Sequence, residues 1–573
     1  MSERIFIGVA WPYANSPLHL GQIAGAYLPP DIFARYHRTK GNEVLMVSGS
    51  DQHGTPITIR AEQEGKAPAE IASKYHQQFL SSWRQLGISF DLFTTTGTTN
   101  HAEVAQDIFL TLLGKDYIYK ATVSQPFCSN CRRFLPDRYI EGTCPYCGYS
   151  GARGDQCDQC GQPLTPAELV EPRCGVCGTA PQFKDSEHFF LRLTAFEDRL
   201  LSWVRQQDHW RLNVLNFTKR YLEAGLRDRA ITRDIDWGVP VPLDGFPGKR
   251  LYVWFEAVIG YLSATKEWAK STGDSEKWRD FWQGEVKSYY FIGKDNILFH
   301  TIIWPAMLMG YDGLNLPYDV PANEYLTIEG RKLSSSRNWA VWLPDYLSRY
   351  DPDPLRYLLS VNMPETGDTN FSWREFIRRN NDELVATYGN LVQRVLTFVY
   401  RNFDGCVPTH SKYKTISKYL NDLTTNMSED AIDKRSLNAV EDAKEFLFRE
   451  TGDLISRCKF KQALLCVMAQ AQEANQYLEE KSPWKQIKVD RQAAADSLYI
   501  ALYVISCLKT ALYPFLPFSS QKLHLMLGFD GNIEDYGWQP MAPKPGQKLL
   551  PPEPLFAKLD EGLVAEETAR LSN

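Results

Sequence analysis

Four Cys-x-x-Cys pairs constrain the fold of this chain more than any other feature of its sequence. They lie close together and account for eight of the twelve cysteines. Eight thiolates are enough for two closed tetrahedral zinc sites, and a closed site stabilises structure rather than catalysing a reaction. The pairs can be coupled in three ways, among which spacing alone does not choose. The eight residues are Cys128, Cys131, Cys144, Cys147, Cys157, Cys160, Cys174 and Cys177.

The alternative to metal is a disulfide framework, which depends on the cellular compartment. The first ten residues lack the basic segment, long apolar run and cleavage site of a secretory signal. We therefore expect a cytoplasmic protein, in which thiols stay reduced and disulfides are rare. Zinc is accordingly the cofactor expected for the cysteine-rich stretch. The other four cysteines are scattered over helical segments and are expected in the core.

Strands and helices alternate on either side of the cysteine-rich stretch. Residues 4–11 and 44–50 have the composition of buried strands, and helical segments follow them. The pattern stops near residue 121, resumes near residue 187 and includes a later strand at 287–292. Such alternation predicts an α/β fold with a doubly wound parallel sheet of the Rossmann type, split by an inserted domain.

Beyond residue 372 the apolar pattern is helical almost throughout, which predicts an all-α helix bundle. Its most apolar segment, 498–518, contains Lys509 and two prolines, so we expect a buried helix and not a membrane span. A length of 573 residues agrees with about four structural units. The expected divisions are the first half of the Rossmann-type domain at 1–120, an inserted zinc-knuckle domain at 121–186, the second half at 187–322, a connector at 323–371, the helix bundle at 372–545 and a C-terminal tail at 546–573.

The turn after the first strand carries His19, Gly21 and Gln22. In doubly wound sheets this turn belongs to the crevice that binds nucleotides. Gly21 lets the backbone approach a ligand closely, while the helix N-terminus and the imidazole offer donors to phosphate oxygens. The motif therefore favours ATP as a ligand. A histidine satisfied by a neighbour on a helix face is the alternative.

The connector carries a second motif, KLSSSR at residues 332–337. A loop with a lysine and several hydroxyls can close over a triphosphate, where lysine stabilises charge that builds up in the transition state. A solvated polar loop is the alternative. The two motifs together, one after the first strand and one after the last sheet unit, resemble the layout of class I aminoacyl-tRNA synthetases.

Five parts of the sequence resemble the methionyl-tRNA synthetase family within that class, and the resemblance covers nearly the whole chain. It implies an enzyme that uses ATP with Mg²⁺ to convert L-methionine to methionyl-adenylate. The acyl group then passes to the 3′ end of tRNA(Met), and the helix bundle binds the anticodon. The five parts are Ala10–Asn15, Asp51–Pro56, Val253–Ala257, Phe291–Asp295 and His300.

The resemblance assigns catalytic roles to His19, Gln22 and Lys332. Gln22 stands where the family has a second histidine, and Ser335 stands where its loop has a second lysine. Gln22 can donate an amide N–H but cannot be protonated, and Ser335 carries no charge. We hypothesise that Arg331 or Arg337 supplies the missing charge. The residues expected to contact ATP are His19, Gly21, Gln22, Lys294, Asp295, Lys332 and Ser335.

The resemblance also implies an aromatic pocket for methionine. Aromatic rings attract a thioether sulfur by about 0.3–1.5 kcal/mol per contact, and Asp51 can bind the substrate ammonium. Polar groups of Tyr13 and His300 near the sulfur would favour methionine over leucine. Taken singly, each aromatic residue has an ordinary place in the core as its alternative. The expected pocket residues are Trp11, Tyr13, Asp51, Trp254, Ala257, Tyr261 and His300.

For the cysteines, the resemblance implies nested coupling. Cys144, Cys147, Cys157 and Cys160 then bind one zinc ion, and the remaining four of the eight bind another.

In the helix bundle, Asn390, Arg394 and Trp484 match the family's anticodon-binding residues, because an unpaired base stacks on an indole while Arg or Asn forms hydrogen bonds with its edge. A Trp packed at a helix start is the alternative. The arginines 378, 379, 394 and 401 form either a phosphate-binding stripe or a solvated face.

Two other functions remain open. One is another class I synthetase for an apolar amino acid, although the short, cysteine-rich insertion leaves no room for a large editing domain. The other is a degenerate synthetase-like tRNA-binding protein, suggested by Gln22 and Ser335. A net charge of −6 neither supports nor excludes RNA binding. Because the chain ends soon after the bundle, we expect a monomer.

Overall fold

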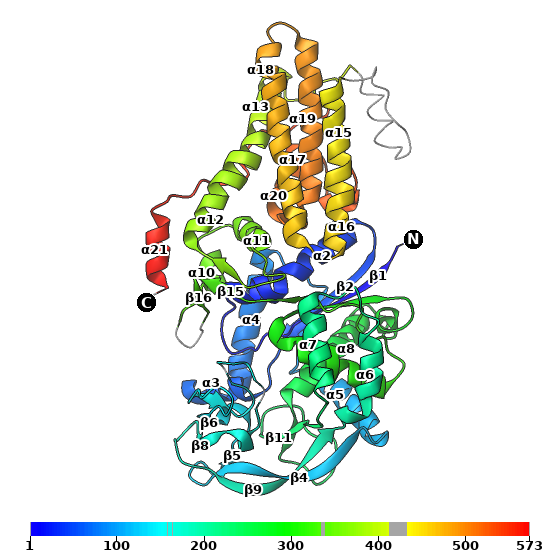
Figure 1. The fold of residues 1–573 in the computed structure, drawn as a ribbon. Helices are drawn as coiled ribbons and strands as arrows, with labels where there is room; N and C mark the ends of the chain where they lie inside the picture. The colour runs from blue at the N-terminus through cyan, green and yellow to red at the C-terminus, as the bar shows by residue number, and fades with distance from the viewer. Residues whose placement is uncertain (1, 158, 163, 334–337, 412–432, 572–573) are drawn as a thin grey trace.

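A five-stranded parallel sheet forms the centre of the N-terminal half (Figure 1). The computed structural model describes residues 2–157, 159–162, 164–333, 338–411 and 433–571. The strand order β14-β13-β1-β2-β3, with every pair parallel, confirms the doubly wound prediction. Covered on both faces, β1 is almost entirely buried, as its apolar sequence requires. The strands are β1 (Arg4–Val9), β2 (Glu43–Ser50), β3 (Leu92–Thr95), β13 (Lys287–Gly293) and β14 (Ala322–Asn323).

Helices that connect these strands cover the sheet. Their ends follow local sequence signals: α4 begins at Pro68, is capped by the Glu70 side chain and ends where Gly87 adopts a positive φ of 75°. The helices are α1 (Leu20–Gln22), α2 (Leu28–Thr39), α3 (Thr55–Glu64), α4 (Pro68–Leu86), α5 (Thr99–Gly114), α6 (Glu197–Val204), α7 (Leu212–Glu223), α8 (Val253–Ser271) and α9 (Trp304–Tyr311).

The cysteine-rich insertion leaves and re-enters this unit through one long antiparallel ribbon. The ribbon pairs β4 with β9 and lies at the end of the molecule opposite the helix bundle (Figure 1). Beyond it, a three-stranded sheet and two cysteine groups enclose a small separate core. The strands of the insertion and its ribbon are β4 (Ile118–Cys128), β5 (Arg133–Phe134), β6 (Ile140–Thr143), β7 (Ala152–Arg153), β8 (Val170–Cys174) and β9 (Gln182–Leu191). The short strands β10 (Arg229–Ala230), β11 (Thr232–Asp234) and β12 (Lys249–Leu251) follow α7 in the sheet unit.

The C-terminal part is a helix bundle that stands on the connector and on α2 (Figure 1). Its α19 is long and apolar enough to cross a membrane, but 94% of its most apolar window is buried inside the protein. This helix forms the core of the bundle. The connector contains β15 (Leu326–Ile328), β16 (Arg331–Lys332), α10 (Leu343–Leu347), α11 (Pro352–Val361) and β17 (Thr369–Phe371). The helices after it are α12 (Trp373–Arg379), α13 (Asn390–Asn402), α15 (Lys434–Lys444), α16 (Thr451–Ser456), α17 (Phe460–Lys481), α18 (Pro483–Gln486), α19 (Arg491–Leu512), α20 (Pro517–Met526) and α21 (Leu563–Arg570).

The C-terminal tail returns along the bundle to the connector. Side chains of Asn380 and Asn381 donate to carbonyl oxygens of residues 557 and 559 at 2.9 and 2.8 Å. In α21, the buried carboxylate of Glu567 accepts hydrogen bonds from Arg349 and Tyr350 of the connector. The tail is thus docked on the part of the chain that precedes the bundle.

A buried ionic cluster joins the sheet unit, the connector and the bundle. Asp31 of α2 accepts from Arg35 at 3.0 Å and from Arg356 of α11 at 2.7 Å. Arg356 is fully buried and also donates to the backbone carbonyls of Pro514 and Phe515, which follow α19. Burial alone would raise the pKa of Asp31. The two nearby guanidinium groups outweigh this effect and lower the pKa to about 2.

Candidate functional site

His19 and Gln22 cap each other at the start of the first helix. The backbone N–H of Gln22 donates to His19 Nδ1 at 3.3 Å, and the backbone N–H of His19 donates to Gln22 Oε1 at 3.0 Å. Burial lowers the pKa of His19 to about 4, so the imidazole is neutral at physiological pH. Because Nδ1 accepts, the proton resides on Nε2. His19 therefore offers one neutral N–H donor, and Gln22 holds the turn that presents it.

The two motifs predicted from the sequence lie against each other. Residues just after the connector loop bond the first motif: Leu20 N–H donates to Val341 O at 3.1 Å, and Leu343 N–H donates to Leu18 O at 2.7 Å. A methyl group on Gly21 would lie 2.3 Å from Leu333 Cδ1, so a larger residue here would push the Leu333 side chain away. Lys332 is exposed beside it on β16. Ser335 and Arg337 lie outside the described residues.

Lys294 and Asp295 follow β13 at the carboxyl edge of the sheet. The ammonium of Lys294 contacts Glu324 at 2.7 Å and Asp368 at 3.0 Å, and it lies 3.8 Å from the centre of the Tyr325 ring. Desolvation lowers the pKa of Lys294, but the two carboxylates outweigh it and the net shift is upward. The Tyr325 hydroxyl donates to Asp295. Lys294 is thus a fixed cation at the edge where nucleotides bind.

Trp11 occupies a slot between two glycines of the sheet unit. Methyl groups built on Gly49 and Gly260 would lie 2.3 and 2.7 Å from its indole. Larger residues at either position would displace the ring. Trp11 is thereby held just after β1, two residues before Tyr13, which pairs with Asp51 through its backbone.

Three of the residues predicted for the methionine pocket lie along one face of α8. Trp254, Ala257 and Tyr261 are three and four residues apart, the spacing of one helical face. His300 Nδ1 lies 2.8 Å from the carbonyl of Asn296, so Nδ1 carries the proton and Nε2 accepts from the Tyr261 hydroxyl at 2.7 Å. Burial lowers the pKa of His300 to about 4. Both ring nitrogens are therefore engaged, and the oxygen of Tyr261 is the polar atom that His300 orients.

Asp51 is a buried carboxylate beside a second one. Burial and the nearby Glu256 both raise the pKa of Asp51 well above its usual range. Glu256 is fully buried and pairs with His53 Nδ1 at 2.5 Å, while His53 N–H donates to Asp51 at 3.1 Å. Sequence reasoning did not single out His53 or Glu256. A glutamate in an otherwise apolar helical segment was the signal that could have found the pair.

A second group missed by sequence reasoning lies between the insertion and the pocket. Arg233 of β11 contacts Asp137 of the insertion at 3.1 Å and lies 3.6 Å from the centre of the Tyr252 ring. Tyr252 in turn packs against Trp254, with ring centres 5.3 Å apart. The positive φ of Asp137, 50°, has no sequence signature. Through these contacts the insertion is linked to Trp254, one of the residues predicted for the methionine pocket.

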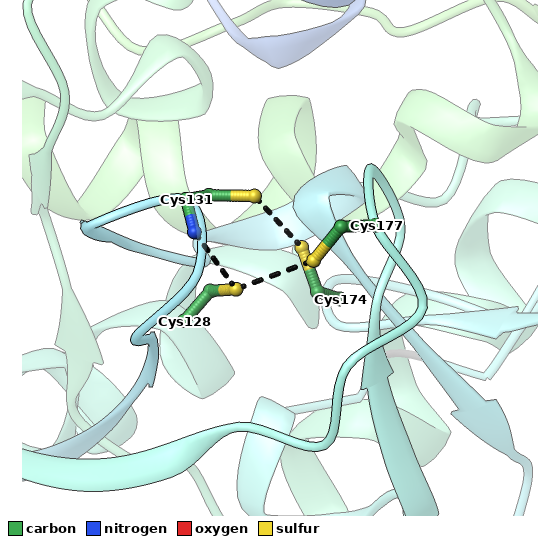
Figure 2. Close-up of side chains that lie close together, drawn as sticks. All are labelled: Cys128, Cys131, Cys174 and Cys177. Carbon is green, nitrogen blue, oxygen red and sulfur yellow. Dashed lines mark hydrogen bonds between the residues drawn. The ribbon is translucent and has the colours of Figure 1, made fainter.

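The eight paired cysteines gather into two groups of four, one of which, Cys128, Cys131, Cys174 and Cys177, is drawn in Figure 2. Within each group all sulfur atoms lie within 4.8 Å of one another, and close pairs are separated by 3.5–3.9 Å. Four thiolates around zinc at 2.3 Å give sulfur–sulfur distances of about 3.8 Å. The donor set and spacing therefore fit tetrahedral zinc. One group is Cys128, Cys131, Cys174 and Cys177, and the other is Cys144, Cys147, Cys157 and Cys160.

At the end of the bundle farthest from the sheet, Arg394 lies over the ring of Trp484 of α18, 4.6 Å from its centre (Figure 1). Asn390 is exposed one turn earlier on α13. An indole, a guanidinium and an amide thus share one surface. Arg394 also pairs with Glu479 at 2.8 Å. Arg378 and Arg379 likewise pair with glutamates, those of their own helical stretch.

Comparisons with known proteins cover almost the entire chain. The family model for class I tRNA synthetases (M) matches residues 5–396, and that for the anticodon-binding domain of methionyl-tRNA ligase matches residues 437–573. A methionine–tRNA ligase from Dehalococcoides mccartyi strain CBDB1 is 63% identical over 571 residues, covering 100% of both chains. One from Thermomicrobium roseum is 51% identical, covering 100% of this chain and 99% of the relative. The solved structure of Mycobacterium tuberculosis methionyl-tRNA synthetase with methionyl-adenylate, at 24% identity, has a TM-score of 0.78 and covers 97% of this chain and 100% of that one.

Proposed function

The chain belongs to the methionine–tRNA ligase family of class I tRNA synthetases, and from that premise we propose how its residues activate methionine and charge tRNA(Met). The observation that carries the proposal is the meeting of the capped turn at His19 with the segment around Leu333, beside an aromatic pocket. Nucleotide and amino acid would be bound on adjacent walls of one crevice. This arrangement suits a reaction between them.

In the first step, a carboxylate oxygen of methionine attacks the α-phosphorus of ATP. The bond between the α- and β-phosphates breaks, and pyrophosphate leaves with the electron pair. His19 donates Nε2–H to a phosphate oxygen, Gln22 keeps that donor oriented, and Lys332 neutralises charge on the leaving group. Mg²⁺ bound with ATP supplies further positive charge. Gly21, Lys294, Asp295 and Ser335 complete the proposed nucleotide site.

For methionine binding, the raised pKa of Asp51 points to a role for this carboxylate in binding the substrate ammonium group. A buried carboxylate beside Glu256 is costly when ionised, and a bound ammonium group would relieve that cost. The Tyr261 oxygen, oriented by His300, faces the thioether together with the rings of Trp11 and Trp254. Tyr13 and Ala257 complete the proposed pocket.

The remaining roles belong to the insertion and the bundle. We assign a structural zinc ion to each cysteine group, and anticodon contacts to Asn390, Arg394 and Trp484. After activation, a ribose hydroxyl of the terminal adenosine attacks the acyl carbon and AMP leaves. We propose that the protein acts as a monomer in the cytoplasm.

Exchange of labelled pyrophosphate into ATP, measured without tRNA against a panel of amino acids, tests this proposal. We expect exchange with methionine alone, followed by aminoacylation of tRNA(Met). Exchange with another amino acid would refute the pocket assignment. A folded protein that binds tRNA(Met) but gives no exchange with any amino acid would instead be a degenerate binding protein, and the departures at Gln22 and Ser335 would explain the loss.

A further inference from the structure

The helix of the first motif changes from α to π geometry just after Gln22. Residues Ile23–Tyr27 form the π segment, and the N–H of Leu28 donates to the carbonyl of Ile23, five residues earlier. The two following residues, Pro29 and Pro30, have no N–H. The local sequence thus removes donors from the middle of a helix, and such π turns are frequent at functional sites.

One consequence is that the carbonyl of Ala24 has no backbone donor at α-helical or π-helical spacing. Its α-helical donor, the N–H of Leu28, is directed to Ile23 instead, and its π-helical donor would be Pro29. Ala24 is fully buried, where water cannot replace the missing bond. The side chain of Asn323 supplies it: Nδ2 donates to the Ala24 carbonyl at 2.9 Å.

Asn323 is itself rigidly held. It is 2% exposed and lies on β14, where its backbone pairs with Gly293 at the carboxyl edge of the sheet. Its Oδ1 accepts from Arg211 Nη1 at 2.6 Å, and Arg211 Nη2 donates to the carbonyl of Cys458 at 2.8 Å. Cys458 lies in the turn between α16 and α17. Hydrogen bonds therefore run from the helix bundle through Arg211 and Asn323 to Ala24.

We propose that Asn323 is a positioning residue for the nucleotide site, held in place by Arg211. A π turn contains one residue more than the α-helix, so its relaxation to α geometry would rotate the preceding turn by about 100° about the helix axis. His19 and Gly21 lie on that preceding turn. By bonding Ala24, Asn323 keeps the π turn and therefore the direction of both residues. The inference rests on the proposed function, in which this turn binds ATP.

Two substitutions separate the contacts of Asn323. Asn323→Asp keeps an acceptor for Arg211 but cannot donate to Ala24, whereas Asn323→Ala loses both bonds. In methionine-dependent pyrophosphate exchange we expect each variant to lower kcat/KM for ATP by about ten-fold or more. KM for methionine should stay within about two-fold, because Trp11, Trp254 and Tyr261 lie on other elements.

Asn380→Ala is the matched control. Asn380 is also 2% exposed, and its Nδ2 donates to a backbone carbonyl, that of Ala557 in the C-terminal tail, at 2.9 Å. It should lower the melting temperature as the Asn323 variants do while leaving kcat/KM for ATP within about two-fold. Because Asp is nearly isosteric with Asn, Asn323→Asp keeps the test open if Asn323→Ala fails to fold.

Three outcomes would overturn the proposal. The first is that the Asn323 variants fold and their kcat/KM for ATP is unchanged. The second is that KM rises equally for ATP and for methionine, as a general loosening of the protein structure would cause. The third is that Asn323→Asp exchanges pyrophosphate at the wild-type rate, which would show that only the contact with Arg211 matters and not the hydrogen bond to Ala24. Absence of exchange in the wild-type protein is a different result, because it would refute the proposed function first.

Discussion

Gln22 shows how a residue that departs from a family pattern can acquire a definite role from its position. Its side chain accepts the backbone N–H of His19, three residues earlier, and completes a reciprocal cap. The sequence predicts that His19, Gly21 and Gln22 belong to a nucleotide-binding turn. It did not identify the cap, because that depends on the residue at which the helix begins, which periodicity leaves uncertain by a few positions.

Replacing Gln22 by Met tests this role, since methionine has similar size but no acceptor. We expect a loss of about 1 kcal/mol of unfolding free energy from the cap. Release of the His19 turn should also lower methionine-dependent pyrophosphate exchange by about ten-fold, equivalent to about 1.4 kcal/mol. The matched control is Glu70→Met, which removes the cap of α4 outside the site. Equal exchange rates in both variants would contradict the assignment.

Among the elements, the strands of the sheet, the insertion and the bundle follow from sequence pattern, whereas their contacts do not. The insertion docks on α3 through Arg133–Glu62 and Tyr139–Thr58 contacts. Such pairs join residues about 70 to 80 positions apart, and side-chain periodicity carries no information at that separation. The docking of α21 on the connector is unpredictable for the same reason.

The prediction for the inserted domain concerns its zinc content and the effect of removing zinc. Two groups of four thiolates should bind about two zinc ions per chain by elemental analysis. Cys147→Ser and Cys177→Ser, one in each group, should each lower the count by about one. Because Asp137 of the insertion contacts Arg233 beside the pocket, chelation should also raise KM for methionine. A count of one in the wild-type protein, or an unchanged count in either variant, would argue against two closed sites.

At the scale of the whole molecule, the buried cluster of Asp31, Arg35 and Arg356 holds three parts of the chain together. The helix α8, which carries Trp254 and Tyr261, lies in the half of the molecule away from the tip of the bundle, where α18 carries Trp484 (Figure 1). Composition and periodicity predicted the separate units. They could not predict their junction, because a charged residue in a helix has the same sequence pattern whether it faces solvent or a buried partner.

Arg356→Met is the corresponding test. Removing one partner of a buried ion pair leaves an uncompensated charge and costs about 3–5 kcal/mol, measurable by urea unfolding at neutral pH. The pKa of Asp31 in the folded protein, about 2, lies below its ordinary value of 3.8. Its stabilising contribution is therefore present above pH 3.8 and lost as pH falls towards 2. The deficit of the variant should shrink over that window, and the double variant with Asp31→Asn should recover part of it at neutral pH. A deficit independent of pH would exclude Asp31 as its source.

The pairing of β1 with β13 also has a consequence for synthesis of the chain on the ribosome. β1 ends at Val9, but the strand that covers its second edge begins only at Lys287. At about 5–20 residues per second, β1 and its first neighbour wait roughly 15 to 60 seconds for that partner. During this interval the nascent chain presents an apolar strand edge of the kind that invites aggregation. Chaperones that shield nascent apolar segments should therefore raise the soluble yield of this protein, and slower translation before residue 287 should lower it.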